Sequence, residues 1–378
     1  MDKTYDFEEE NKLGIIRLLL ALAVIIVHTT PVFGLKLVGA EVAVNSFFII
    51  SGFYMSLALN EKYKAVSSNK LFYKNRFLRL YPLYYFVWVL TLIGYAVSMS
   101  MGKGGYGLHV LMNVKMGIGA ILYAAFGNVT MLGINFTPSL NLTAAGGLAL
   151  VPWNGNNTVV GSFFIVWQAW SLSLEILFYI LAPYIVRRNA KFVAIFLLVS
   201  VGLRYILAAT IFTKYIVLSR FFPTEVWTFL LGVLSYKLYV KMKTIKISNY
   251  IGFSLLAFMI LFTAIFQFLP ATEGRYWIYL ICMALSIPLI FNSTKELKFD
   301  KNIGELSYPL FISHIFIRDM LKPYLSTTTD LGFIVVVVTI LLGMLQVKFI
   351  IEPINKRKYK IKTLPQEPII STLQPGSS

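Results

Sequence analysis

Long apolar runs, separated by short polar stretches, occur along most of the chain. A helix that crosses the hydrocarbon core of a membrane needs about 20 mostly apolar residues. Membrane-spanning helices are predicted at 13–32, 40–59, 80–99, 164–186, 192–212, 224–240, 250–269, 276–293, 304–323 and 331–351. The pattern therefore predicts an all-α polytopic membrane protein with about ten transmembrane helices.

The distribution of basic residues predicts how these helices are oriented. With ten spans and a cytoplasmic N-terminus, 23 Lys and Arg residues fall in inner segments and 8 in outer segments. Cytoplasmic loops carry an excess of Lys and Arg, so both termini are expected to be cytoplasmic. This topology explains the net charge of +17 without a nucleic-acid partner, and a chain with 57% hydrophobic and 13% charged residues is too apolar for soluble domains.

A shorter apolar run, 118–133, is not predicted to cross the membrane. It contains several glycines, and counting it as a span would invert every later loop against the charge distribution. We expect it to lie on or dip into the outer face, within an outer segment of about 100–163. Residues 1–355 are predicted to form one transmembrane domain, and 356–378 a cytoplasmic tail that is first basic and then disordered.

Ionisable side chains inside the predicted spans are the first candidates for function. Each costs roughly 2.5–3.5 kcal/mol on insertion scales. The candidates are Arg17, His28, Glu175, Arg204, His314, Asp319 and, at the start of the second span, Glu41.

Arg17 and His28 share the first span and one face of it. Their separation of 11 residues corresponds to about 20° more than three full turns and about 16.5 Å along the axis. Arg17 is predicted near the inner boundary and His28 near the outer one. A snorkelling anchor and a packed interfacial imidazole are the structural alternatives. The functional interpretation makes His28 a general base, because the pKa of imidazole lies near working pH.

Glu175 and His314 are both predicted near the membrane midplane, where they could pair. A structural polar contact between helices is the alternative. Asp319 and Glu41 are predicted closer to the depth of His28, so either could orient its imidazole. We expect the third histidine, His109 in the outer segment, to be a surface residue.

Arg76 and Arg79 end the most basic inner loop. Two guanidinium groups at i and i+3 of a helix lie on the same side, and arginine suits phosphate recognition. Ordinary positive-inside charge is the alternative.

Five motifs in order give the chain a resemblance to the acyltransferase-3 family of integral-membrane acyltransferases, over about 13–353. They are Arg17-x10-His28, Phe47-Phe48-x-x-Ser51-Gly52-Phe53, Arg76-x-x-Arg79 followed by Pro82, Trp170-Ser171-Leu172-Ser173-x-Glu175, and Ser307-Tyr308 through His314. The chain departs from the family at Asn45 and Ile176, where many members have acidic residues. These departures affect how an acid–base pair would be oriented.

The resemblance implies transfer of an acyl group, commonly acetyl, from cytoplasmic acyl-CoA to a hydroxyl of a cell-surface or lipid-linked carbohydrate. It suggests a polysaccharide O-acetyltransferase of the plasma (inner) membrane. His28, Arg17 and Glu175 would be catalytic, and Arg76 and Arg79 would bind acyl-CoA. Supporting roles fall to Ser51, Ser173, His314, Asp319 and Glu41.

The expected partners are acyl-CoA as donor substrate, the carbohydrate or glycolipid acceptor and membrane lipids. We expect no bound cofactor, no metal site and no nucleic acid. Two alternatives stay open. The acyl group could pass through a covalent intermediate on His28 or Ser51, or the protein could instead be a transporter or flippase for glycolipid or polysaccharide.

Overall fold

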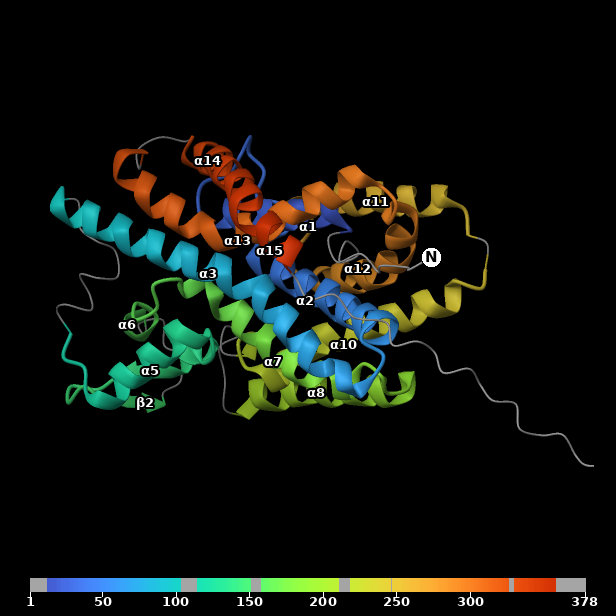
Figure 1. Cartoon of the computed structure of the whole chain (residues 1–378), viewed down its shortest axis with the longest axis horizontal. Helices are drawn as coiled ribbons and strands as arrows, with labels where there is room; N and C mark the ends of the chain where they lie inside the picture. Colours follow the sequence, from blue (N-terminus) through green and yellow to red (C-terminus); the bar gives the residue numbers. More distant parts are fainter. Residues whose placement is uncertain are drawn as a thin grey trace, which may run out of the picture.

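The computed structural model describes residues 12–102, 114–150, 158–210, 218–245, 247–325 and 330–357. Its longer α-helices are α1 (Gly14–Val27), α2 (Gly39–Leu57), α3 (Asn69–Ser100), α5 (Ile118–Thr130), α7 (Trp170–Ile185), α8 (Ala190–Thr210), α10 (Phe222–Met242), α11 (Asn249–Ile265), α12 (Glu273–Thr294), α13 (Lys298–Leu325) and α14 (Leu331–Gln346) (Figure 1). His109 and 358–378 lie outside the described residues, so the predictions made for them are not addressed.

Short elements complete the described chain. They are α6 (Thr158–Gly161), α15 (Glu352–Arg357), the π-helical turns η2 (Ala58–Lys62) and η7 (Val347–Ile351), the 3₁₀ turns η3 (Val66–Ser68), η4 (Ile134–Ser139), η5 (Trp167–Ala169) and η6 (Phe266–Phe268), and the antiparallel strands β1 (Leu140–Leu142) and β2 (Leu148–Leu150).

The structure confirms the all-α polytopic fold. A helix lies at each of the ten predicted spans. Six helical segments among the described residues are long and apolar enough to cross a membrane: Gly39–Lys62, Asn69–Ser100, Ala190–Thr210, Asn249–Phe268, Glu273–Thr294 and Leu331–Lys356. The total of ten spans and the cytoplasmic termini stay predictions.

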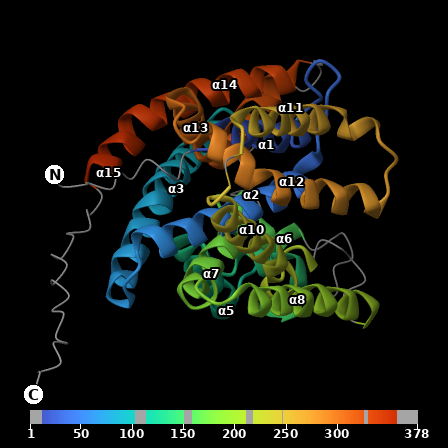
Figure 2. The ribbon, with the colours of Figure 1, turned by 90° about the vertical axis from the view of Figure 1, so that its right-hand side faces the viewer.

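Helix α2 is the central helix of the bundle. Of the most apolar stretch of this helix, 94% is buried inside the protein. The corresponding share for α8 is 17%. Neighbouring helices surround α2 in both views (Figures 1 and 2). Glycine allows α10 to approach, because a Cβ on Gly52 would lie 2.0 Å from the carbonyl oxygen of Phe229. The glycine of the Ser51-Gly52-Phe53 motif therefore brings two helix backbones together.

Helix α1 is held against the start of α13. The backbone N–H of Ile15 donates to Oδ1 of Asp300 at 2.9 Å. The first N–H groups of a helix have no partner within the helix, so Asp300 satisfies one of them. A Cβ on Gly14 would clash with the Asp300 carbonyl oxygen at 1.7 Å, so the close contact requires glycine.

Helix α5, in the run predicted to lie on or dip into the outer face, ends against the middle of α3. Tyrosine hydroxyls of α3 donate to the last carbonyls of α5. The bonds are Tyr81 to Thr130 (2.7 Å), Tyr84 to Asn128 (2.8 Å) and Tyr85 to Val129 (2.6 Å). Tyr81 lies about 18 Å along α3 from its first residue. These carbonyls lack intrahelical partners, and the tyrosines satisfy them away from water.

Arg204 is engaged in a buried ion pair between α8 and α10. Its Nη1 lies 2.5 Å from Oε2 of Glu225, and the two side chains are 5% and 0% exposed. This intramembrane arginine therefore has a structural partner within the bundle.

Candidate active site

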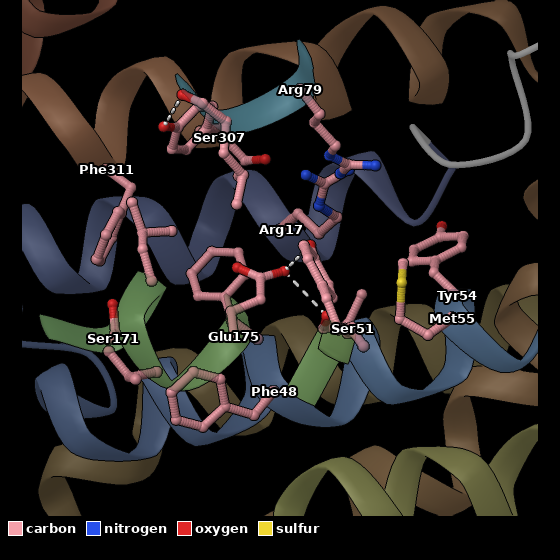
Figure 3. Close-up of a pocket in the computed structure, with 17 residues that line it drawn as sticks. Arg17, Phe48, Ser51, Tyr54, Met55, Arg79, Ser171, Glu175, Ser307 and Phe311 are labelled. Carbon is pink, nitrogen blue, oxygen red and sulfur yellow. Dashed lines mark hydrogen bonds between the residues drawn. The ribbon is translucent and has the colours of Figure 1, made fainter. Parts of the chain in front are cut away.

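A cavity opens among five helices, α1, α2, α3, α7 and α13. It encloses about 700 Å³ of empty space, counted with its open end. Its polar lining consists of Arg17, Ser51, Tyr54, Arg79, Ser171, Glu175, Tyr179, Ser307 and Tyr308. Figure 3 shows the labelled members of this set around one space, with Phe48 and Phe311 among its apolar walls. All five sequence motifs therefore contribute to one cavity lining, the Arg76-x-x-Arg79 motif through Arg79.

Glu175 accepts two hydrogen bonds on one carboxylate oxygen. Ser51 Oγ, from α2, donates to Oε1 at 2.9 Å, and the Tyr179 hydroxyl donates to the same oxygen (Figure 3). Tyr179 lies one helical turn after Glu175, so the two side chains share a face of α7. No described residue donates to the other oxygen, Oε2.

Arg17 and Arg79 place two cations in the lining, opposite this carboxylate. Arg17 is 6% exposed and lies within electrostatic range of both Arg79 and Glu175. Figure 3 shows both arginine side chains reaching into the cavity. We call the part of the bundle that holds Arg17 and Arg79 the arginine end. Guanidinium groups suit the recognition of a phosphate group.

Arg76 occupies a different environment from Arg79. Its side chain is buried, and its guanidinium lies 5.5 Å from the ring centroid of Phe72 and 5.8 Å from that of Tyr179. It does not belong to the cavity lining. Arg76 and Arg79, which were predicted to act together, therefore lie in different environments. Arg79 faces the cavity, and Arg76 packs behind Tyr179, which bonds Glu175.

His28 and His314 lie together beyond the cavity. Their ring centroids are 5.3 Å apart with planes tilted by 30°, and the edge of Trp167 meets His28 at 5.6 Å. We call this pair the histidine end. Phe311 connects it to the cavity, because this ring lines the cavity and lies 6.0 Å from the ring of His314.

The hydrogen bonds of His314 determine its tautomer. Nδ1 lies 2.7 Å from the carbonyl oxygen of Phe311. A carbonyl only accepts, so Nδ1 carries the proton and Nε2 of the neutral ring presents a lone pair. Nε2 is buried and has no hydrogen-bond partner among the described residues.

The two ends are ordered along the same helices. On α1, Arg17 precedes His28 by about 16.5 Å of helix axis. On α13, the cavity residue Tyr308 precedes His314 by roughly 9 Å. A substrate that fills the cavity can therefore extend from cationic groups toward an imidazole pair.

The expected pairing of Glu175 with His314 does not form. Glu175 bonds Ser51 and Tyr179, and His314 contacts His28.

Three further supporting candidates have neighbours other than His28. Asp319 accepts from Arg318 at 2.5 Å and from Tyr95 at 3.4 Å. Glu41 is exposed in the first turn of α2 and lies within electrostatic range of Glu225. Ser173 donates to Oδ1 of Asn135 at 2.7 Å, on a fully buried face of α7. That an acidic residue orients His28 stays a prediction, and Asp319 itself is paired with Arg318.

Sequence reasoning assigned no role to the tyrosines of the cavity, although Tyr308 belongs to one of the five motifs. Tyr54, Tyr179 and Tyr308 bring hydroxyl groups into its lining. The spacing of four residues between Glu175 and Tyr179 would have predicted the contact between these two side chains. The Tyr308 hydroxyl donates across helices to the Leu80 carbonyl at 2.8 Å, a contact without local spacing to reveal it.

Comparison with known proteins gives one extended match. A family model described as an acyltransferase domain, of the acyltransferase-3 type, matches residues 10–352. Neither the curated proteins nor the solved structures contain a match to this chain. The matched range includes the cavity, the arginine end and the histidine end.

Proposed function

This chain belongs to the acyltransferase-3 family, and from that premise we propose the reaction that its cavity carries out. The protein is a membrane acyltransferase. In the proposed reaction it transfers an acyl group, commonly acetyl, from cytoplasmic acyl-CoA to a hydroxyl of a cell-surface or lipid-linked carbohydrate. The observation that carries the proposal is the order of the site, with Arg17 and Arg79 at one end and His28 with His314 at the other.

The arginine end would receive the donor. The predicted topology places it toward the cytoplasm, where acyl-CoA is found. CoA carries a pyrophosphate and a 3′-phosphate, and guanidinium groups bind such oxygens through paired, charge-assisted hydrogen bonds. Arg79 and Arg17 would hold this charge while the pantetheine arm extends through the cavity.

Glu175 would keep these cations in place. Arg17 and Arg79 carry like charges, and their mutual repulsion is opposed by the carboxylate nearby. Ser51 and Tyr179 fix the orientation of that carboxylate through their two hydrogen bonds. Arg76, packed against the ring of Tyr179, would support the same arrangement from behind.

His28 would act as the general base at the other end. It removes the proton of the acceptor hydroxyl while the hydroxyl oxygen attacks the thioester carbonyl carbon. The carbon–sulfur bond breaks, CoA leaves as a thiolate, and the proton on His28 passes to that thiolate. The unprotonated Nε2 of His314, next to His28, can accept a hydrogen bond as the charge on His28 changes.

Ser51 provides the competing route within the same reaction. Its hydroxyl donates to the Glu175 carboxylate, an arrangement that can activate a serine nucleophile. Incubating purified protein with radiolabelled acetyl-CoA and no acceptor separates the routes. A labelled protein that loses its label in Ser51→Ala would favour the relay, and an unlabelled protein favours direct transfer.

Two measurements test the proposed function. Purified protein in detergent, without any gradient, should consume the acetyl-CoA thioester when acceptor glycan is added. Mass spectrometry of surface glycans from cells with and without the gene should differ by one acyl unit. A glycan that changes its location but not its mass, with no thioester consumed, would indicate a transporter or flippase.

A further inference from the structure

Four separate segments bring aromatic and cationic groups to the histidine end. His28 ends α1, Trp167 and Trp170 lie at the start of α7, Arg220 precedes α10, and Arg318 belongs to α13. Arg220 and Arg318 both lie within electrostatic range of His28. All five side chains are partly exposed, so a ligand can reach them.

Arg220 is the unusual member of this set. Its guanidinium lies 4.4 Å from the ring centroid of Trp170. Among the described residues, no carboxylate pairs with it and no group accepts a hydrogen bond from its guanidinium. Burial lowers the pKa of Arg220 to about 10, which still leaves it charged at neutral pH.

The other arginines near the predicted outer side have partners within the protein. Arg318 forms an ion pair with Asp319 at 2.5 Å, and Arg204 forms one with Glu225 at 2.5 Å. Arg275 lies over Phe266 at 4.8 Å but donates to the carbonyls of Phe266 and Leu269. Arg220 resembles Arg275 in its aromatic contact and differs in that no residue the structure describes accepts from its guanidinium.

An arginine held on a tryptophan face is oriented before any ligand arrives. Contact with the ring restricts the side chain, and the N–H donors remain in the fork that matches a carboxylate or phosphate. The backbone of Arg220 is also held, because its carbonyl accepts from Asn135 Nδ2 at 3.0 Å. Such preorganisation lowers the entropy lost on binding.

We propose that Arg220, Trp170 and Trp167 form the acceptor site, and that the acceptor is an anionic carbohydrate. Its carboxylate or phosphate binds Arg220, its sugar ring lies against the exposed tryptophan surface, and a hydroxyl reaches His28. The assignment of this ligand as acceptor depends on the proposed function. The binding of an anionic sugar at this site does not depend on the proposed function.

Binding to purified protein, without acyl-CoA, tests this inference. Each of two ligand pairs differs mainly in charge: glucuronosyl-glucose against cellobiose, and farnesyl diphosphate glucose against farnesyl glucoside. Quenching of tryptophan fluorescence reports occupancy. We expect the anionic member of at least one pair to bind about tenfold more tightly or better, as for one charge-assisted hydrogen-bonded contact. The pair that shows the difference identifies the anion as a uronic acid or a lipid diphosphate.

Variants at two matched arginines complete the test. Arg220→Gln should remove most of the preference for the anionic ligand. Arg220→Lys keeps the positive charge but loses the paired N–H donors of guanidinium, so it should retain part of the preference. Arg275→Gln should bind as the wild type does. Equal affinity of wild-type protein for both members of both pairs would overturn the inference, as would a preference that survives Arg220→Gln.

The binding result is separable from the reaction. If the protein prefers the anionic ligand but consumes no thioester, the result supports the binding site and contradicts the proposed acyl transfer. Thioester consumption with neutral acceptors, and no charge preference in binding, would keep acyl transfer and remove this site.

Discussion

The imidazole rings of His28 and His314 lie 5.3 Å apart, one at the end of α1 and one inside α13. His314 Nδ1 donates a hydrogen bond to the Phe311 carbonyl oxygen. Its buried Nε2 therefore presents a lone pair with no partner among the described residues. Two imidazoles in contact, one with a defined tautomer, form a suitable proton-accepting group at the end of a substrate cavity.

We predict that His28→Ala abolishes acyl transfer. A general base contributes about 10²–10⁴-fold, so the turnover number should fall by at least about 100-fold while KM for acyl-CoA changes little. Thioester consumption by purified protein measures both. His109→Ala is the matched control and should retain activity. Near-normal turnover in His28→Ala would remove the histidine from the mechanism.

Arg76 and Arg79 should respond differently to the same substitution. Arg79→Gln should raise KM for acyl-CoA because it removes a cation from the cavity lining. Arg76→Gln should mainly lower thermal stability, because it removes cation–π contacts with Phe72 and Tyr179 that contribute roughly 0.5–2 kcal/mol each. Lys70→Gln, at an exposed position of the same helix, controls for general loss of positive charge. Equal effects of all three substitutions would indicate positive-inside charge alone.

Glu175→Gln should reduce acyl transfer at unchanged expression. Glutamine has the same shape and can still accept from Ser51, but it no longer offsets the charges of Arg17 and Arg79. We expect kcat/KM for acyl-CoA to fall about tenfold or more, as for loss of one charge-assisted contact. Steady-state kinetics check this, with the exposed Glu296→Gln as control. Unchanged kinetics would assign Glu175 a purely structural role.

Arg204→Ala should destabilise the bundle strongly. It would leave the Glu225 carboxylate, which is 0% exposed, without its partner, and breaking a buried pair on one side costs about 3–5 kcal/mol. Thermal unfolding in detergent measures the loss. Replacing both residues, Arg204→Met with Glu225→Leu, should recover most of it, since no buried charge remains. A double variant as unstable as the single one would contradict this account.

Asn128→Ala should loosen α5. The Asn128 amide oxygen accepts from Trp88 Nε1 and from the Ile165 backbone N–H, each at 3.1 Å. Alanine would leave both donors buried without a partner, at a cost of roughly 1–3 kcal/mol each. Limited proteolysis should show faster cleavage near 118–139. Leu122→Ala, which shortens an exposed side chain of the same helix, should cleave at the wild-type rate.

The sequence by itself determined the elements and the chemistry they carry. A helix is found at each of the ten places where apolar run lengths predicted one. The 11-residue spacing of Arg17 and His28 predicted one face of α1, because helical periodicity is a local property. The five motifs predicted the family that the match over 10–352 then established.

Only the tertiary structure decided which side chains meet. Glu175 has Ser51 and Tyr179 as partners instead of His314, and Arg76 faces aromatic rings whereas Arg79 faces the cavity. Spacing along one helix fixes a direction, but contact between helices depends on their rotation, depth and crossing, which the packing of all side chains sets together. The contact of Arg220 with Trp170 depends on such packing, because it joins residues of two segments that no sequence period relates.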